Sequence, residues 1–207
     1  MVGIVDYGVG NLFSLSSSFA AIGEKALVSR DRSELGACDR LVLPGVGAFG
    51  DAARLLQKTG MADFVLSEAA AGKPILGICL GMQLLFERSL EYGDHRGLGL
   101  IPGTVRPIAE AIPSGLKIPH IGWNALHFVK DDPLFRYVKE GDFVYFVHSF
   151  HGTDCEGATV AVTEYGAPLV AAVASGNVVG CQFHPEKSGA VGLSILRAFA
   201  EGEVGAC

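Results

Sequence analysis

The sequence lacks the features that mark several large classes of protein. It has 16 Lys and Arg against 22 Asp and Glu, a net charge of −6, and no cluster of basic residues. Nucleic-acid-binding domains usually carry a basic patch or stripe, so we do not expect that function. No segment approaches the roughly 18 consecutive apolar residues of a membrane helix. The N-terminus carries Asp6 and has no basic start, so no signal peptide is expected either.

Cysteine is scarce, and the spacing of the cysteines predicts neither disulfide bonds nor a zinc knuckle. The 5 cysteines stand at positions 38, 79, 155, 181 and 207, an odd number without a C-x-x-C pair. Neither a disulfide framework nor a zinc knuckle fits this spacing. We therefore expect reduced thiols in a cytoplasmic protein.

The sequence does have enough apolar material for one well-buried core. Its 207 residues are 49% hydrophobic and 18% charged. Single cores stop growing at about 250–300 residues, so we expect one domain over residues 1–207. In the first half, apolar runs predict strands at 2–6, 26–28, 41–43 and 74–78, and helical periodicity predicts helices at 12–22, 50–71 and 80–86.

The second half has closely spaced apolar runs with few helices between them. Apolar strands separated by helices indicate a parallel sheet that is buried on both faces. The predicted class is therefore α/β in three layers, with a mostly parallel mixed sheet, helices on both faces and antiparallel additions in the second half. Strands are expected near 105–108, 125–129, 143–148, 158–163, 169–174 and 178–183, and a last helix at 189–200.

The densest chemical signal is Gly77-Ile78-Cys79-Leu80-Gly81, which follows a predicted strand and starts a predicted helix. It has the G-x-C-x-G form of a nucleophile elbow, in which glycines allow a sharp turn that exposes the sulfur at the sheet edge. A helix N-terminus favours a thiolate, and the Leu80 amide beside the sulfur can donate to an oxyanion. We predict that Cys79 is a nucleophile, whereas the other cysteines fit ordinary packing.

A thiol nucleophile needs a base, and His184 is the best candidate among the 6 histidines. It ends a predicted strand in the segment His184-Pro185-Glu186, where Pro185 favours extended backbone. Residues two apart then face the same side, so Glu186 can orient the imidazole. Cys79 and His184 both follow buried strands, whose carboxyl ends share one edge of a parallel sheet. The sequence therefore predicts a triad of Cys79, His184 and Glu186.

Two rival chemical interpretations use overlapping residues. His148, His151, His184 and Glu186 could form a zinc site, but their spacing matches no common metal signature. The loop from Gly45 to Gly50 satisfies G-x-G-x-x-G, yet no acidic residue ends the next strand, as dinucleotide binding requires. The loop is better used to bring backbone amides beside Cys79, as a second oxyanion donor and a substrate contact.

Taken together, these motifs resemble the class I, or triad, glutamine amidotransferases. The resemblance spans residues 2 to about 199 and departs from the family nowhere in the triad, although the tail 201–207 matches nothing in it. The branch it most resembles supplies ammonia to a cyclase that makes imidazole glycerol phosphate in histidine biosynthesis. The segments that carry the resemblance are Val5 to Leu12, Pro44 to Gly50, Gly77 to Gln83, Ile121 to Asn124, Tyr145 to Ser149 and Phe183 to Ser188.

The resemblance implies a reaction and a partner. Glutamine would be hydrolysed through a thioester on Cys79, without a cofactor or a metal. Ammonia would then pass through the protein interior to a (β/α)₈ cyclase in a heterodimer. The implied oxyanion donors are Leu80 and the Val46–Gly47 loop; the implied glutamine contacts are Gly47, Gln83, Ser149 and Phe150; the candidate interface residues are Asn11, Trp123, Tyr145 and Lys187.

Two other functions stay open at this point. The chain could serve another amidotransferase branch, for pyridoxal phosphate, anthranilate or GMP synthesis, although the Asp6-Tyr7-Gly8 start and the Pro44 to Gly50 loop favour the histidine pathway. It could also be a non-catalytic module that keeps the elbow only to bind a partner. A protein that has lost its catalytic activity has no physical need for a reactive thiol, so the complete triad argues against that function.

Overall fold

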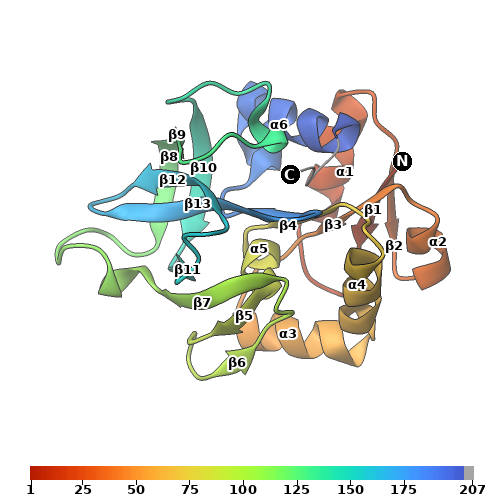
Figure 1. Ribbon diagram of the computed structural model, residues 1–207, viewed down its shortest axis with the longest axis horizontal. Helices are drawn as coiled ribbons and strands as arrows, with labels where there is room; N and C mark the ends of the chain where they lie inside the picture. Colours follow the sequence, from red (N-terminus) through yellow and green to blue (C-terminus); the bar gives the residue numbers. More distant parts are fainter. Residues whose placement is uncertain (203–207) are drawn as a thin grey trace.

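A central sheet of eight strands crosses the molecule (Figure 1). The computed structural model describes residues 1–202 and gives the strand order β2-β1-β3-β4-β14-β13-β12-β9. The first five strands pair in parallel, and the last three join through antiparallel pairs. In that order the strands are Ala26–Ser29, Val2–Val5, Arg40–Leu43, Ile75–Ile78, Val178–Cys181, Pro168–Ser175, Thr159–Glu164 and His127–Phe128.

Helices cover both faces of this sheet, so the predicted three-layer α/β class is confirmed. Figure 1 shows α1 and α6 on one side and α3, α4 and α5 on the other. Neighbouring strand residues alternate between the layers: Ile4 packs in the core with Phe19 of α1, and Val5 packs in the core with Phe49 of α3. Burial on both faces explains why the strands are continuous apolar runs. The helices are α1 (Leu12–Ala21), α2 (Arg32–Gly36), α3 (Phe49–Lys58), α4 (Met61–Ala70), α5 (Leu80–Leu85) and α6 (Gly189–Glu201).

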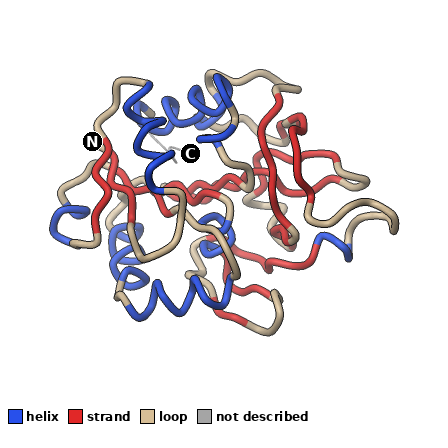
Figure 2. Tube along the Cα trace, turned by 180° about the vertical axis from the view of Figure 1, so that it is seen from behind, coloured by secondary structure: helices blue, strands red, loops and turns tan. Residues whose placement is uncertain are grey.

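Two smaller sheets complete the fold. Figure 2 shows added strands at the end of the molecule opposite the N-terminus. The antiparallel pair β8 (His120–Ala125) and β10 (Phe143–His148) forms one sheet. The other has the order β11-β7-β5-β6, made of Phe150–Thr153, Ile101–Pro107, Phe86–Ser89 and His95–Arg96.

The structure corrects several predicted element boundaries. The helix expected at 50–71 is two helices, because Gly60 adopts a left-handed φ of 70° between α3 and α4. The strand expected at 125–129 is split, since the chain leaves β8 after Ala125 and joins a different sheet at β9. The pattern did not predict α2, β5, β6 or β11, which are short and depend on tertiary contacts, and it anticipated only Ala125 of β8.

Within residues 1–202, no helix has the length and apolar character that a membrane crossing requires. The four cysteines in this part of the chain are unpaired and buried. Cys207, also expected to be a packed cysteine, lies outside the described residues.

The turn from β4 into α5 has almost no spare space. A Cβ added to Gly81 would lie 1.8 Å from the Leu43 carbonyl oxygen, and one added to Gly77 would lie 2.7 Å from the Met82 Cα. These obstacles are backbone atoms, which cannot move aside as a flexible side chain can. Glycine is therefore required at both positions for β3, β4 and α5 to pack together.

We expect Gly81→Ala to lower the free energy of unfolding by at least about 1–3 kcal/mol, the usual cost of overpacking. Gly36→Ala is the matched control, because an added Cβ there meets nothing within 4 Å and the residue lies in α2. That change should be neutral or stabilising by up to about 1 kcal/mol. Urea denaturation of both variants measures the difference, and equal effects would contradict the packing argument.

Candidate active site

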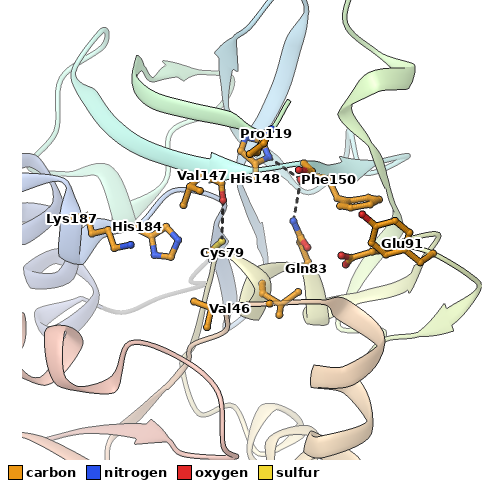
Figure 3. A pocket seen from close by; sticks show the side chains of 14 residues that line it. Val46, Cys79, Gln83, Glu91, Pro119, Val147, His148, Phe150, His184 and Lys187 are labelled. Carbon is orange, nitrogen blue, oxygen red and sulfur yellow. Dashed lines mark hydrogen bonds between the residues drawn. The ribbon is translucent and has the colours of Figure 1, made fainter. Parts of the chain in front are cut away.

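A cavity of about 420 Å³ lies beside the carboxyl ends of β4 and β14, where the predicted nucleophile and base both stand (Figure 3). In open α/β sheets this edge is the usual place for a ligand. Every predicted nucleophile, base, oxyanion and glutamine-contact residue lines the cavity. Its walls are Val46, Gly47, Cys79, Leu80, Gln83, Glu91, Tyr92, Pro119, Val147, His148, Ser149, Phe150, His184 and Lys187.

Cys79 occupies the turn between β4 and α5 with strained backbone geometry. Its φ of 54° and ψ of −111° are unusual for a residue with a side chain. The Cys79 amide donates to the Cys181 carbonyl at 2.8 Å, and Gln182 Nε2 lies 3.7 Å from the sulfur. Such strain costs about 1–3 kcal/mol and persists only where surrounding contacts enforce it. The sulfur thus reaches the cavity from a rigid support.

His184 and Glu186 form a buried pair beside Cys79. The distance between His184 Nδ1 and Glu186 Oε1 is 2.8 Å, and the two side chains are only 3% and 2% exposed. Burial lowers the pKa of His184, but hydrogen bonds and charge interactions with Cys79 and Glu186 outweigh burial and raise that pKa to about 9. His184 therefore carries its proton at neutral pH and can give it to a leaving group.

The glycine loop packs directly against the start of α5. A Cβ on Gly45 would lie 2.8 Å from the Gly81 amide nitrogen, so the two segments touch through their backbones. Tyr7 supports the loop from below, because its buried hydroxyl donates to the Pro44 carbonyl at 2.8 Å. Val46 and Gly47 line the cavity next to Leu80. The backbone of the Val46–Gly47 loop and the backbone of Leu80 at the start of α5 consequently border the same cavity.

Gln83 connects the nucleophile helix to the opposite wall of the cavity. Its Nε2 donates to the Phe150 carbonyl at 3.0 Å and to Gln182 Oε1 at 2.9 Å. Gln182 in turn approaches Cys79. Both amide hydrogens of Gln83 therefore bind protein groups, and this network holds the cavity walls in register.

The sequence analysis missed two polar cavity residues, Glu91 and Tyr92, and also Pro119. Glu91 is 8% exposed, and its Oε2 accepts a hydrogen bond from the Phe49 amide at 2.8 Å. Burial raises the pKa of this carboxyl group. Tyr92 is 89% exposed and meets the Phe150 ring edge-on at 5.8 Å. No motif surrounds these residues, and only the folded chain brings them beside Cys79.

The predicted interface residues fall into two places. Trp123 and Tyr145 meet edge-on with ring centroids 6.0 Å apart, and Lys187 Nζ lies 5.8 Å from the Tyr145 ring centre. Trp123 is 51% exposed, and Lys187 also lines the cavity. These three residues therefore form a continuous patch, which we call the aromatic patch. Asn11 instead caps α1 by accepting a hydrogen bond from the Ser14 amide at 3.4 Å.

Of the residues of the alternative zinc site, His148 is engaged in other hydrogen bonds, whereas the buried Nδ1 of His151 has no partner among the described residues. His148 Nε2 lies 2.9 Å from His120 Nδ1, and its Nδ1 lies 2.8 Å from the Phe150 carbonyl oxygen. Among residues 1–202, no three His, Cys, Asp or Glu side chains are grouped so that they could hold a metal ion.

The comparisons with known proteins identify close relatives. Residues 4–201 match the family model of glutamine amidotransferase class-I. The imidazole glycerol phosphate synthase subunit HisH of Caldanaerobacter subterraneus is 50% identical over 202 residues, covering 97% of this chain and 98% of that protein. The subunit of the same name from Wolinella succinogenes is 49% identical over 203 residues, covering 97% and 99%.

Solved structures show the same fold at lower sequence identity. A glutamine amidotransferase crystal structure has a TM-score of 0.75 at 20% identity and covers 97% of both chains. The PurLQS structure from Thermotoga maritima has a TM-score of 0.74 at 21% identity and covers 96% of both chains. At such identities, the likeness concerns the fold alone.

The raised pKa of His184 predicts a pH-dependent stability. Because the folded-state pKa lies above the unfolded value of about 6.5, the contribution is fully present below pH 6.5. It is lost as the pH rises through about 9. Glu186→Gln removes one source of the shift, so its free energy of unfolding should fall less than that of the parent between pH 6.5 and 9. Urea denaturation across this range measures the free energy of unfolding of both proteins. Parallel curves of that free energy against pH would refute the contribution of Glu186 to the raised pKa of His184.

Proposed function

The chain belongs to the class-I glutamine amidotransferase family, and we propose that it is the glutaminase subunit of imidazole glycerol phosphate synthase. It hydrolyses glutamine to glutamate and ammonia in histidine biosynthesis. The observation that carries this proposal is the approach of Cys79, His184 and Glu186 at one end of the cavity, in a chain 50% identical to a HisH subunit. The whole of residues 1–207 acts as one glutaminase domain in the cytoplasm.

Catalysis begins when the Cys79 sulfur, as a thiolate beside the protonated His184, attacks the side-chain amide carbon of glutamine. The carbonyl oxygen becomes an oxyanion, which accepts hydrogen bonds from the Leu80 amide and from the Val46–Gly47 loop. The C–N bond then breaks, and His184 gives its proton to the leaving nitrogen, so ammonia departs and a thioester remains. Glu186 holds the imidazole in the required tautomer and stabilises its charge.

Water completes the cycle. His184, now neutral, takes a proton from the water that attacks the thioester carbon. The tetrahedral intermediate collapses to glutamate, and the sulfur leaves with the imidazolium restored beside it. No cofactor or metal is needed, because the nucleophile, the proton carrier and the oxyanion donors all come from this chain.

Glutamine recognition uses both walls of the cavity. Gly47, Gln83, Ser149 and Phe150 contact the substrate, partly through backbone atoms. Glutamine also carries an α-ammonium group, and Glu91 is the only carboxylate among the described residues that line the cavity. Opposite charges attract strongly where water is largely excluded, so we assign Glu91 to the α-ammonium.

The ammonia acceptor is a second subunit. The relatives' names mark them as subunits of a synthase, which supports an assembly with a partner chain. We propose a heterodimer with a (β/α)₈ cyclase, which takes up ammonia through the protein interior. The aromatic patch of Trp123, Tyr145 and Lys187 borders the cavity and provides the docking surface, together with Asn11.

Glutamate release from glutamine tests the proposal when it is measured with and without the cyclase subunit and its nucleotide ligand. We expect turnover to rise strongly only when both are present. Cys79→Ala should lower kcat by at least about 10⁴-fold, the scale of nucleophile loss in a triad hydrolase. Cys38→Ala is the control, since Cys38 is buried and is not among the residues that line the cavity. Retained turnover in Cys79→Ala would refute the assignment. So would the absence of turnover in every sample of the unsubstituted protein.

Glu91→Gln tests the substrate contact. A charged hydrogen bond contributes about 1.5–3 kcal/mol, so KM for glutamine should rise about 10- to 150-fold while kcat changes little. The Gln side chain can still accept from the Phe49 amide, which preserves the local structure. Asp51→Asn serves as the control, because it removes one charge from an exposed side chain nearby. Equal KM values for the Glu91 and Asp51 variants would contradict the assignment.

A further inference from the structure

A chain of side-chain hydrogen bonds leads from the cavity wall to the sulfur of Cys79. Gln83 Nε2 lies 3.0 Å from the Phe150 carbonyl oxygen and 2.9 Å from Gln182 Oε1. Gln182 Nε2 in turn lies 3.7 Å from Cys79 Sγ, within reach of an N–H···S hydrogen bond because sulfur is larger than oxygen. We call these contacts the amide chain.

The direction of every bond in the amide chain follows from its first contact. The Phe150 carbonyl can only accept a hydrogen bond, so the Gln83 atom that faces it is the amide nitrogen. The same nitrogen faces Gln182, and two NH2 groups cannot bond to each other, so the Gln182 atom there is its oxygen. The NH2 group of Gln182 is thereby fixed toward the Cys79 sulfur. Neighbours that can only accept thus set the orientation of both amides.

Gln182 is held by the main sheet and lies behind the cavity surface. It follows β14 directly, its side chain is fully buried, and its backbone amide donates to the Ala171 carbonyl of β13 at 2.8 Å. Gln182 is not among the residues that line the cavity. The group on which its amide acts is therefore the sulfur of Cys79 and not the substrate.

A buried N–H group favours a sulfur that accepts strongly. Within residues 1–202, the Cys79 sulfur is the only acceptor that Gln182 Nε2 reaches. A thiol sulfur is a weak acceptor, whereas a thiolate accepts as an ion, so the buried amide is fully satisfied only by the thiolate. The Val147 carbonyl oxygen, 4.0 Å from the sulfur, favours the thiol because it can only accept. Gln182 is the closer of these two neighbours.

Ionisable side chains face Cys79 from several elements. Those in electrostatic contact with it are Tyr7, Cys181 and His184. Those that share its cavity are Glu91, Tyr92, His148 and Lys187. Burial raises the pKa of Tyr7 and of Cys181 and lowers the pKa of His148 to about 3, so these three are uncharged near pH 7. His184 is the charged partner of the sulfur, and Gln182 is an uncharged donor beside it.

We propose that Gln182 is a catalytic residue that keeps the Cys79 sulfur in its reactive thiolate form, and that Gln83 is a positioning residue that holds the Gln182 amide in the required direction. The same N–H receives the sulfur when the thioester breaks down, because the electron pair of the broken carbon–sulfur bond returns to the sulfur. The effect on turnover rests on the proposed function, whereas the donor to the sulfur does not.

The pH profile of Cys79 alkylation by iodoacetamide, followed on the peptide that contains Cys79, tests the donor without any turnover. The thiolate is the reacting form. Gln182→Met has a similar length but no N–H. Below the midpoint of the profile, alkylation should be about 3- to 30-fold slower, with the midpoint raised by about 0.5–1.5 pH units, as for one long charged hydrogen bond. The difference should vanish at alkaline pH, and an unchanged midpoint would overturn the inference.

Two further variants separate the donor from packing. Phe183→Leu is the control, because Phe183 is equally buried in the same segment but has no part in the amide chain, so its midpoint should match that of the unsubstituted protein. A Phe183→Leu midpoint raised as far as that of Gln182→Met would overturn the inference. Gln83→Met removes the group that orients Gln182 and should raise the midpoint too. An unchanged midpoint in Gln83→Met would overturn the positioning role of Gln83.

Nitrogen-15 NMR of the glutamine side chains in the unsubstituted full chain tests the contact even if a variant fails to fold. An Nε2 hydrogen signal of Gln182 should shift with the same pH midpoint as the alkylation, and a signal that does not follow it would overturn the inference. In glutamine turnover, Gln182→Met should lower kcat and leave KM little changed, since Gln182 does not line the cavity. A raised KM with unchanged kcat would overturn the catalytic role. Absence of turnover in the unsubstituted protein, with the expected alkylation profiles, would count against the proposed function alone.

Discussion

The rest of the structure depends on the close contact of three backbone segments around Gly81. The end of β3, the start of α5 and the turn after β4 approach one another without intervening side chains, and an added Cβ would overlap a carbonyl oxygen. This contact forces Cys79 into a left-handed conformation and directs its sulfur to the sheet edge. The same contact brings the Pro44 to Gly47 loop beside Leu80. Nucleophile and oxyanion donors are therefore positioned by one packing constraint.

Buried polar groups form two different kinds of network around that constraint. His184 and Glu186 are complementary, because a carboxylate faces a protonated ring and their mutual attraction outweighs the cost of burying both groups. A second buried network runs from Asn124 Oδ1 through His120 and His148 to the Phe150 carbonyl, and both of its end groups accept. In a low-dielectric interior the hydrogen bonds of such networks are strong and hold the side chains in place. The first network fixes His184 beside Cys79, and the second braces the cavity wall at Phe150.

The cavity itself is assembled from segments that are remote in sequence. One wall comes from the glycine loop and α5, another from the end of β10 and the start of β11, and Glu91 enters from the turn after β5. Gln83 joins the first two walls through the Phe150 carbonyl and Gln182. The hydrogen bonds of a single amide thus link the main sheet to the smaller sheet that contains β11, and the substrate space lies between them.

The sequence by itself determined the α/β class, most of the main-sheet strands and the family, because apolar strands buried on both faces and the glycine-flanked elbow are local patterns. It also predicted Cys79, His184 and Glu186 together, since residues that end neighbouring parallel strands must share one edge. Only the tertiary structure decided the break at Gly60, the transfer of the chain from β8 to β9, the place of Glu91 and the pairing of His120 with His148. These features depend on contacts between distant segments, and no local periodicity or motif records which buried polar group will face which.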